Sequence, residues 1–166
     1  MIESLLIRGV ALFEETFLVF GNGLHVLTGE TGAGKSLVVD AVDFLCGAKT
    51  DRDLLRAGSD KAYVEGVFKV DGLPKLLETL ETLELEADNG FLTLSRELSA
   101  SGRSVYRAGG VAVSQAAFRM LTVHLIDLHG QHEHQSLLQE SRHLSFLDAF
   151  GSETHEARVH RVCGLY

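Results

Sequence analysis

The chain has 166 residues, of which 45% are hydrophobic and 23% are charged. This composition is sufficient for one buried core and excludes a disordered chain. The formal net charge of −8 at pH 7 gives no overall attraction to polyanions, so any contact with nucleic acid requires a local basic patch.

The first predicted elements are two strands and a helix. Runs of β-branched and large apolar residues predict short strands in ESLLIRGV (residues 3–10) and ETFLVFGNGLHVLTG (residues 15–29), with a tight turn at residues 21–23. The apolar positions of KSLVVDAVDFLCG (residues 35–47) cover most of a helical wheel. This pattern predicts a helix that is buried on nearly every side and ends at Gly47.

The middle of the chain predicts further strands and one helix. AYVEGVFKV (residues 62–70) alternates as a strand does, and PKLLETLETLEL (residues 74–85) places four leucines on one helical face. GFLTLSREL (residues 90–98) and RSVYRAG (residues 103–109) predict a hairpin that turns at Gly102.

The last predicted elements are mainly helical. A helix capped by Ser114 is expected to lead into a strand at residues 125–128. The segment from Ser136 is amphipathic and predicts a helix to about Phe150. Residues 151–166 have little apolar periodicity, so we expect them to form a tail.

The strongest functional motif is GETGAGKS, residues 29–36, which matches the phosphate-binding pattern GxxxxGK[ST]. Its place between a predicted strand and a predicted helix would aim backbone N–H groups and the positive end of the helix at a phosphate. Lys35 would reach the β- and γ-phosphates, and the Ser36 hydroxyl would bind Mg²⁺. Gly32 and Gly34 let the chain wrap without an obstructing Cβ, whereas the other members contribute mainly backbone. The predicted nucleotide-binding residues are Gly29, Glu30, Thr31, Gly32, Ala33, Gly34, Lys35 and Ser36.

This motif predicts nucleotide binding but does not separate the classes of P-loop protein. Hydrolysis in these folds usually requires an apolar strand that ends in Asp, often followed by Glu, to hold Mg²⁺ and polarise water. Asp127 follows Leu125 and Ile126 and is the nearest candidate, but His129 stands where the glutamate would be sought. The sequence contains no clear Walker B strand and no LSGG-like signature.

Three stretches together resemble the RecN family of bacterial DNA-repair proteins, which are relatives of the SMC proteins. They are residues 20–47, residues 56–68 and above all IDLHGQHEHQSLL, residues 126–138. The resemblance covers about residues 1–150 in order and implies an α/β fold, the N-terminal half of a P-loop, ABC/SMC-type ATPase head. The implied sheet is mixed and has an antiparallel β subdomain. The C-terminal half would follow a long coiled coil, toward which residues 151–166 would lead.

The resemblance also implies roles for residues outside GETGAGKS. Gln131 falls where SMC-like heads carry a Q-loop glutamine, which touches Mg²⁺ and the attacking water, so it is the implied catalytic and metal-binding residue. The alternative is a solvated polar loop residue. Either Arg52 or Arg56 would fill the place of an arginine near the phosphates. The alternative for each is a surface arginine paired with a nearby aspartate.

The histidines around Gln131 raise a second possibility. His129, His132 and His134 could converge on one Zn²⁺ ion, with Glu133 as a fourth ligand. The interpretation that we favour is a polar loop whose histidines donate and accept hydrogen bonds with the backbone and with neighbouring side chains.

The leading functional hypothesis is an ATP-binding half-head of an SMC-like protein that acts in recombinational repair of DNA double-strand breaks. ATP and Mg²⁺ are the expected cofactors, and the complete protein, rather than this chain alone, is expected to be an ATPase. The expected partners are the C-terminal half of its own head, a second head in an ATP-dependent dimer, and DNA. One alternative is an ABC transporter subunit, in which Phe13, Phe17 or Phe20 would stack on the nucleotide. The other is a non-catalytic nucleotide-binding interaction module.

We expect a cytoplasmic, nucleoid-associated protein without a membrane partner. No apolar run approaches the roughly 20 residues of a membrane helix, and the N-terminus lacks the features of a secretory signal. Cys46 and Cys163 lie far apart and belong to no CxxC pair, so reduced thiols are expected.

Overall fold

The computed structural model describes residues 1–30, 34–48 and 54–128, and individual positions between residues 144 and 162. The chain divides into two compact units, Met1–Asp127 and Leu128–Tyr166. Because most of the second unit lies outside the described residues, the predicted helix from Ser136 and the predicted boundary after Phe150 stay predictions.

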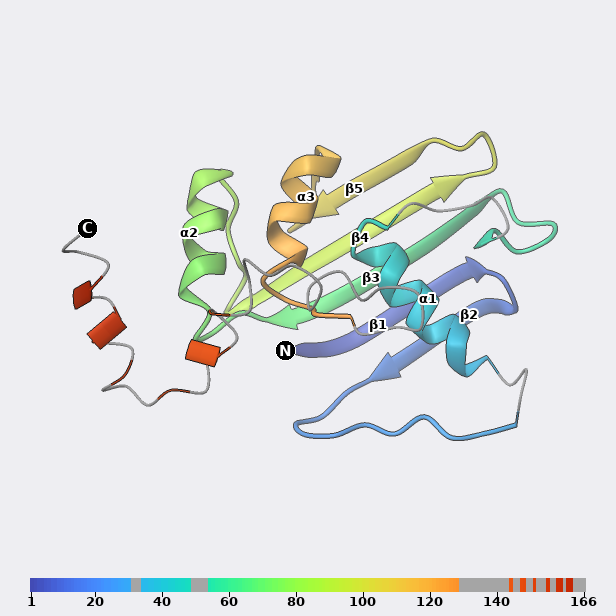
Figure 1. Ribbon diagram of the computed structural model, residues 1–166. Helices are drawn as coiled ribbons and strands as arrows, with labels where there is room; N and C mark the ends of the chain where they lie inside the picture. Colours follow the sequence, from blue (N-terminus) through green and yellow to red (C-terminus); the bar gives the residue numbers. More distant parts are fainter. Residues whose placement is uncertain are drawn as a thin grey trace. The chain divides into compact units, whose positions relative to one another are not determined.

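The first unit is built on one six-stranded sheet, in which every pair of neighbouring strands is antiparallel (Figure 1). The strand order is β2-β1-β3-β4-β5-β6. The strands are β1 (Ile2–Val10), β2 (Phe13–Val19), β3 (Lys61–Lys69), β4 (Phe91–Ser99), β5 (Ser104–Ala108) and β6 (Val111–Val113).

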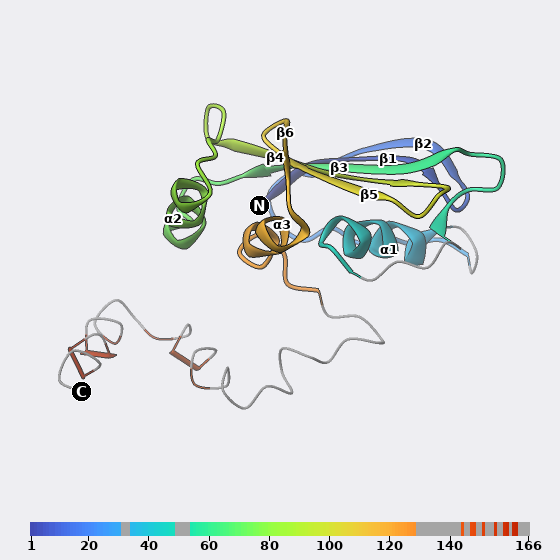
Figure 2. The same cartoon turned by 90° about the horizontal axis from the view of Figure 1, so that it is seen from above.

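Three helices lie on one face of this sheet (Figure 2). They are α1 (Lys35–Leu45), α2 (Pro74–Thr82) and α3 (Gln115–Thr122). Apolar side chains alternate inward along the central strands, as a sheet covered on one face requires. The core between the two layers includes Leu5, Ile7, Phe44, Leu45, Val64, Phe68, Leu92, Leu94, Phe118 and Leu121.

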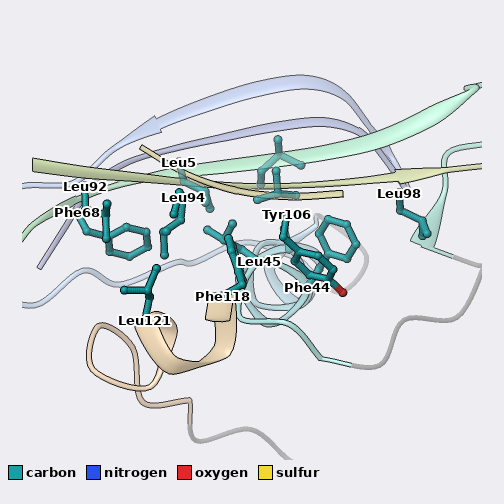
Figure 3. Packing of buried hydrophobic residues seen from close by; sticks show 14 of the residues in the cluster. Leu5, Phe44, Leu45, Phe68, Leu92, Leu94, Leu98, Tyr106, Phe118 and Leu121 are labelled. Carbon is teal, nitrogen blue, oxygen red and sulfur yellow. The ribbon is translucent and has the colours of Figure 1, made fainter. Parts of the chain in front are cut away.

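Helix α1 is seated on the sheet through Phe44 and Leu45, which point into the core (Figure 3). Gly66 of β3 lies opposite this helix. A Cβ atom at Gly66 would come 2.8 Å from Leu45 Cδ2 and 2.8 Å from the Phe68 ring. The glycine therefore lets α1 approach the sheet closely, and this approach sets the place of the loop that precedes the helix.

Most of the predicted elements are confirmed. The predicted strands at residues 3–10 and 62–70 correspond to β1 and β3, and the predicted hairpin is β4 and β5, with Gly102 at a φ of 86° in the turn. All three predicted helices within residues 35–122 are present. Strand β6 was not predicted; it has only three residues.

Two predicted strand segments are wrong. The second predicted strand ends as β2 at Val19, and residues 24–28 form no strand. Leu24 and Val26 are 90% and 71% exposed, so the apolar run finds neither a neighbouring strand nor a layer to pack against in the described unit. The strand predicted at residues 125–128 is also absent, because Leu125 leaves α3 through a turn and packs partly buried against the core instead of pairing.

Within the ranges that the structure describes, no helix is long and apolar enough to cross a membrane.

Candidate nucleotide-binding site

The GETGAGKS motif begins in the connection from β2 to α1 and ends in the first turn of α1. The structure describes Gly29, Glu30, Gly34, Lys35 and Ser36. The other three motif residues, Thr31, Gly32 and Ala33, lie outside the described residues. The expected helix is present as α1, but it is not buried on nearly every side: only Ala41, Phe44 and Leu45 are buried and Val39 is 46% exposed, because the helix packs on the sheet along one face. The strand expected directly before the turn is not formed.

The N-terminal end of α1 has no side-chain cap. Its N-cap residue is Gly34, with φ 89° and ψ 5°, and the first turn contains no acidic residue. The first N–H groups of a helix have no partner within the helix. These donors and the positive end of the helix dipole can therefore serve an anion that approaches from the loop.

Gly34 is required at this end of α1 for two reasons. Its φ of 89° lies in the left-handed region, which residues with a Cβ rarely adopt. A Cβ atom there would also lie 3.2 Å from Cζ of Phe13. Phe13, at the start of β2, thus lies directly beside Gly34. Phe17 is exposed. Phe20 packs edge-to-face on His25, with the ring centroids 5.4 Å apart.

Lys35 turns back over its own loop. Its Nζ donates hydrogen bonds to the carbonyl oxygens of Gly29 and Glu30, the second at 2.7 Å. The ammonium group is therefore held by the first two residues of the motif, and a phosphate oxygen could replace one of their carbonyls as its acceptor. Ser36 is exposed in the first turn of α1, so its hydroxyl is accessible to a metal ion bound at that phosphate.

Arg56 is anchored to the turn between β1 and β2. Its Nη1 donates to the Leu12 carbonyl oxygen at 2.7 Å, its backbone N–H donates to Gly9 at 3.0 Å, and its Nη2 lies 4.0 Å from Glu14 Oε2. Because Phe13 belongs to the same turn region and borders Gly34, Arg56 is held in the neighbourhood of the loop. Its nucleotide contact stays a prediction, and Arg52 lies outside the described residues.

The residues expected to act in hydrolysis are mostly outside the described part of the chain. Asp127 closes the first unit in an irregular segment after α3, not at the end of a strand. Gln131 and the three histidines at 129, 132 and 134 lie in the segment that is not described, so the metal-sensor and zinc interpretations stay predictions. The described residues contain no cluster of three or more His, Cys, Asp or Glu side chains that could hold a metal.

Two arginines that no sequence motif marks contact the other end of α1. Arg96 of β4 and Arg119 of α3 donate hydrogen bonds to carbonyl oxygens at the C-terminal end of the helix. Burial lowers the pKa of Arg96, and Arg119 adds to that shift while Tyr106 and Asp43 oppose it. The available signal was Arg96 itself, a charged residue at an inward position of an alternating strand.

The chain matches the family model of the AAA domain over residues 4–154. It is 37% identical over 166 residues to the DNA repair protein RecN of Halalkalibacterium halodurans, covering 100% of this chain and 29% of that protein. It is 40% identical over 164 residues to the DNA repair protein RecN of Treponema pallidum, covering 98% of this chain and 29% of that protein. The chain thus spans less than a third of the length of these two relatives.

The fold is also similar to that of solved SMC ATPases. One such structure, described for ATP-driven dimerization and DNA-stimulated activation, superimposes with a TM-score of 0.60 at 23% identity, covering 74% of this chain and 78% of that chain. This likeness shows the fold of an SMC-type ATPase head. The described strands correspond to the antiparallel β part of the expected mixed sheet, and no parallel pair occurs among them. The chain therefore belongs to the AAA domain family, and within that family it matches the RecN proteins along nearly its whole length.

Proposed function

We propose that this chain is the ATP-binding half of an SMC-like ATPase head that acts in the repair of DNA double-strand breaks. The observation that carries the proposal is the N-terminal end of α1, which lies in GETGAGKS, has a glycine as its N-cap and has no side-chain cap. The similarity to RecN proteins supports DNA repair as the process. Neither the transporter subunit nor the non-catalytic interaction module gains support from these similarities.

The described residues fit a nucleoside triphosphate with its magnesium ion. The free N–H groups of α1 would hold phosphate oxygens, and Lys35 would exchange its two loop carbonyls for the β- and γ-phosphates. Ser36 would bind Mg²⁺, which neutralises charge on the phosphates when it is bound, and Gln131, which lies outside the described residues, is proposed as a second ligand. Gln131 would also orient the attacking water, while Arg52 or Arg56 would add positive charge.

The proposed first partner is the C-terminal half of the same head. The segment from Leu24 to Leu27 is apolar and exposed, directly before the phosphate-binding loop. An exposed apolar segment that forms no strand among the described residues is a site where a strand of a partner could add. A strand from the C-terminal half would cover this segment and bring the missing acidic residues to the phosphates, so this chain alone is proposed to lack ATPase activity.

Two further partners belong to the complete protein. A second head would close over the bound ATP, and DNA would be the macromolecule on which the complete protein acts, in the cytoplasm at the nucleoid. The similar SMC ATPases, with their ATP-driven dimerization and DNA-stimulated activation, support both partners. Because the net charge of this chain is −8, DNA would have to contact a local basic surface or another part of the protein.

The experiment that tests the proposal is a calorimetric titration of the full-length protein with Mg·ATP. In Lys35→Ala the phosphates lose their dedicated cation, and a hydrogen bond to a charged group of this kind corresponds to an affinity loss of about 10- to 100-fold. The matched control is Lys61→Ala, since Lys61 donates to Glu97 at 2.8 Å on the sheet and belongs to no part of the loop. Equal affinities in the Lys35→Ala and unchanged proteins would contradict the assignment of the loop.

A further inference from the structure

Polar side chains from two other elements converge on the C-terminal end of α1. Arg119 of α3 donates to the Gly47 carbonyl oxygen from Nε at 3.1 Å and from Nη2 at 2.6 Å. Thr122, one turn farther along α3, donates from Oγ1 to the Cys46 carbonyl oxygen at 3.3 Å. The last carbonyl groups of a helix have no partner within the helix, so these bonds satisfy acceptors that would otherwise need water.

Arg96 reaches the same end of α1 from the sheet. Its Nη1 donates to the carbonyl oxygens of Phe44 at 2.7 Å and Ala48 at 2.8 Å. The guanidinium carbon lies 4.2 Å from the centroid of the Phe44 ring and 5.0 Å from that of Tyr106. Figure 3 shows these two rings side by side under the sheet. We call Arg96, Arg119 and Thr122 the C-terminal clamp.

The burial of Arg96 indicates that its hydrogen bonds to the carbonyl groups of α1, and not only its volume, are needed at this position. Its side chain is 3% exposed, and its Nε has no hydrogen-bond partner among the described residues. Arginine keeps its charge despite a lowered pKa, so the chain bears the cost of burying a cation. An apolar side chain of similar size would fill the same place at lower cost, but it could not bind the helix carbonyls.

Gly47, which follows the last turn of α1, leaves space for the Arg119 side chain. It has a φ of 89°, and a Cβ atom at this position would lie 3.2 Å from Cγ and 3.3 Å from Nε of Arg119. The glycine that ends the helix therefore also provides the space in which the guanidinium group of Arg119 reaches the carbonyl. The end of α1 is shaped to accept the two cations, which also complement the negative end of the helix dipole.

We propose that Arg96 and Arg119 are positioning residues for the nucleotide. Helix α1 has 11 residues. A helix of this size is rigid and roughly 16 Å long. Hydrogen bonds at its C-terminal end therefore set the position of Lys35 and of the first backbone N–H groups at its N-terminal end. The clamp fixes α1 to β4 and α3. It thereby keeps Lys35 and the first N–H groups of α1 in the position in which they would bind the phosphates. This inference rests on the proposed function and assigns residues to it that touch neither nucleotide nor metal.

The test uses Arg119, which is more exposed than Arg96, so that its variants fold. In the full-length protein, Arg119→Gln removes the charge and the paired donors, and the affinity for Mg·ATP is expected to fall about 3- to 10-fold, the size of a single hydrogen-bonding group. Arg119→Lys keeps the charge and one donor and is expected to recover part of this loss. Amide hydrogen exchange over residues 44–48 in the nucleotide-free protein is expected to accelerate in Arg119→Gln, because the end of the helix is released.

Two controls separate positioning from general effects. Arg107→Gln removes the same charge from an exposed position on β5 and is expected to change neither affinity nor exchange over residues 44–48. Leu80→Ala removes a buried side chain from α2 and is expected to lower Tm without weakening Mg·ATP binding. If Leu80→Ala weakens binding as much as Arg119→Gln does, the loss reflects stability alone and the positioning role is wrong.

The outcomes also distinguish this inference from the proposed function. Normal Mg·ATP binding by both the unchanged protein and Arg119→Gln would overturn the clamp and leave the proposed function intact. Absence of binding by the unchanged full-length protein would overturn the proposed function, and the clamp with it.

Discussion

The two ends of helix α1 differ in their hydrogen bonding. Side chains bind the carbonyl groups at the C-terminal end, which we call the closed end, whereas no side chain caps the N-terminal end, which we call the open end. At the closed end, Arg96, Arg119 and Thr122 donate to four carbonyl oxygens. At the open end, Gly34 offers no side chain to the first N–H groups. Both ends of a helix carry backbone groups without a partner in the helix, and among the described residues no side chain serves those of the open end, which leaves them available to an anion.

A second helix shows that the chain caps an N-terminal end where no ligand is needed. Ser114 precedes α3, and its Oγ accepts a hydrogen bond from the Ala117 N–H at 3.1 Å. Serine is among the best N-cap residues, whereas a left-handed glycine contributes no side-chain acceptor. Helix α2 also begins without a side-chain cap, at Leu73, so the missing cap alone does not distinguish α1. What distinguishes α1 is a left-handed glycine as its N-cap within GETGAGKS, and this difference can be probed by changing each of these helix ends in turn.

The largest effect is expected from unseating α1 as a whole. Gly66→Ala places a methyl group 2.8 Å from Leu45 Cδ2 and from the Phe68 ring, so the helix or the ring must move. Overpacking of this kind lowers the free energy of unfolding by about 1 to 3 kcal/mol. Both ends of α1 shift together, so Mg·ATP affinity should fall along with Tm.

Gly21→Ala is the matched control for Gly66→Ala. A Cβ at Gly21 would have no atom within 4 Å, so neither denaturation midpoint nor affinity should change. Chemical denaturation and calorimetric titration measure both quantities. A Gly66→Ala protein with unchanged stability would mean that α1 does not depend on its close approach to β3.

The next effect is expected from breaking the open end alone. Gly34→Ala forces a residue with a Cβ into a φ of 89° and brings that atom 3.2 Å from Phe13 Cζ. The left-handed conformation costs an L-residue about 1 to 2 kcal/mol. The strain is confined to the N-terminal end of α1, so Mg·ATP affinity should drop. Amide hydrogen exchange near Gly47, at the C-terminal end of α1, should stay slow. Fast exchange at both ends would show that they are not independent.

The fold was largely predictable because its signals are local. The run of residues 35–47 predicts a helix, although not that only one of its faces is buried, and the alternation in residues 62–70 identifies β3 without knowledge of its neighbours. The same logic fails at residues 24–28, where the apolar run is typical of a strand but the described unit supplies no strand to pair with it. A strand depends on its neighbour, and the sequence of one segment does not contain that neighbour.

The site was predictable to the extent that a motif describes it. GETGAGKS identified the open end of α1 because its spacing matches a known phosphate-binding geometry. The closed end has no such spacing. Arg96 and Arg119 contact carbonyls 52 and 72 positions away in the chain, and only the packing of β4 and α3 against α1 brings them together. Arg96 interrupts an inward apolar row, a signal of a buried charge that does not reveal its partner.

The smallest effect is expected at the capped end of α3. Ser114→Ala removes the acceptor of the Ala117 N–H, and loss of such a cap lowers the free energy of unfolding by about 1 kcal/mol. No phosphate is expected at this helix end, so Mg·ATP affinity should stay at its original value even though Tm falls. Thermal denaturation and titration of the same preparation measure the two responses, and Ser114→Asp should restore the lost stability because aspartate also caps a helix. If Ser114→Ala weakened nucleotide binding as much as Gly34→Ala does, the N-terminal ends of α1 and α3 would not differ in function. The assignment of the open end of α1 as the ligand site would then be wrong.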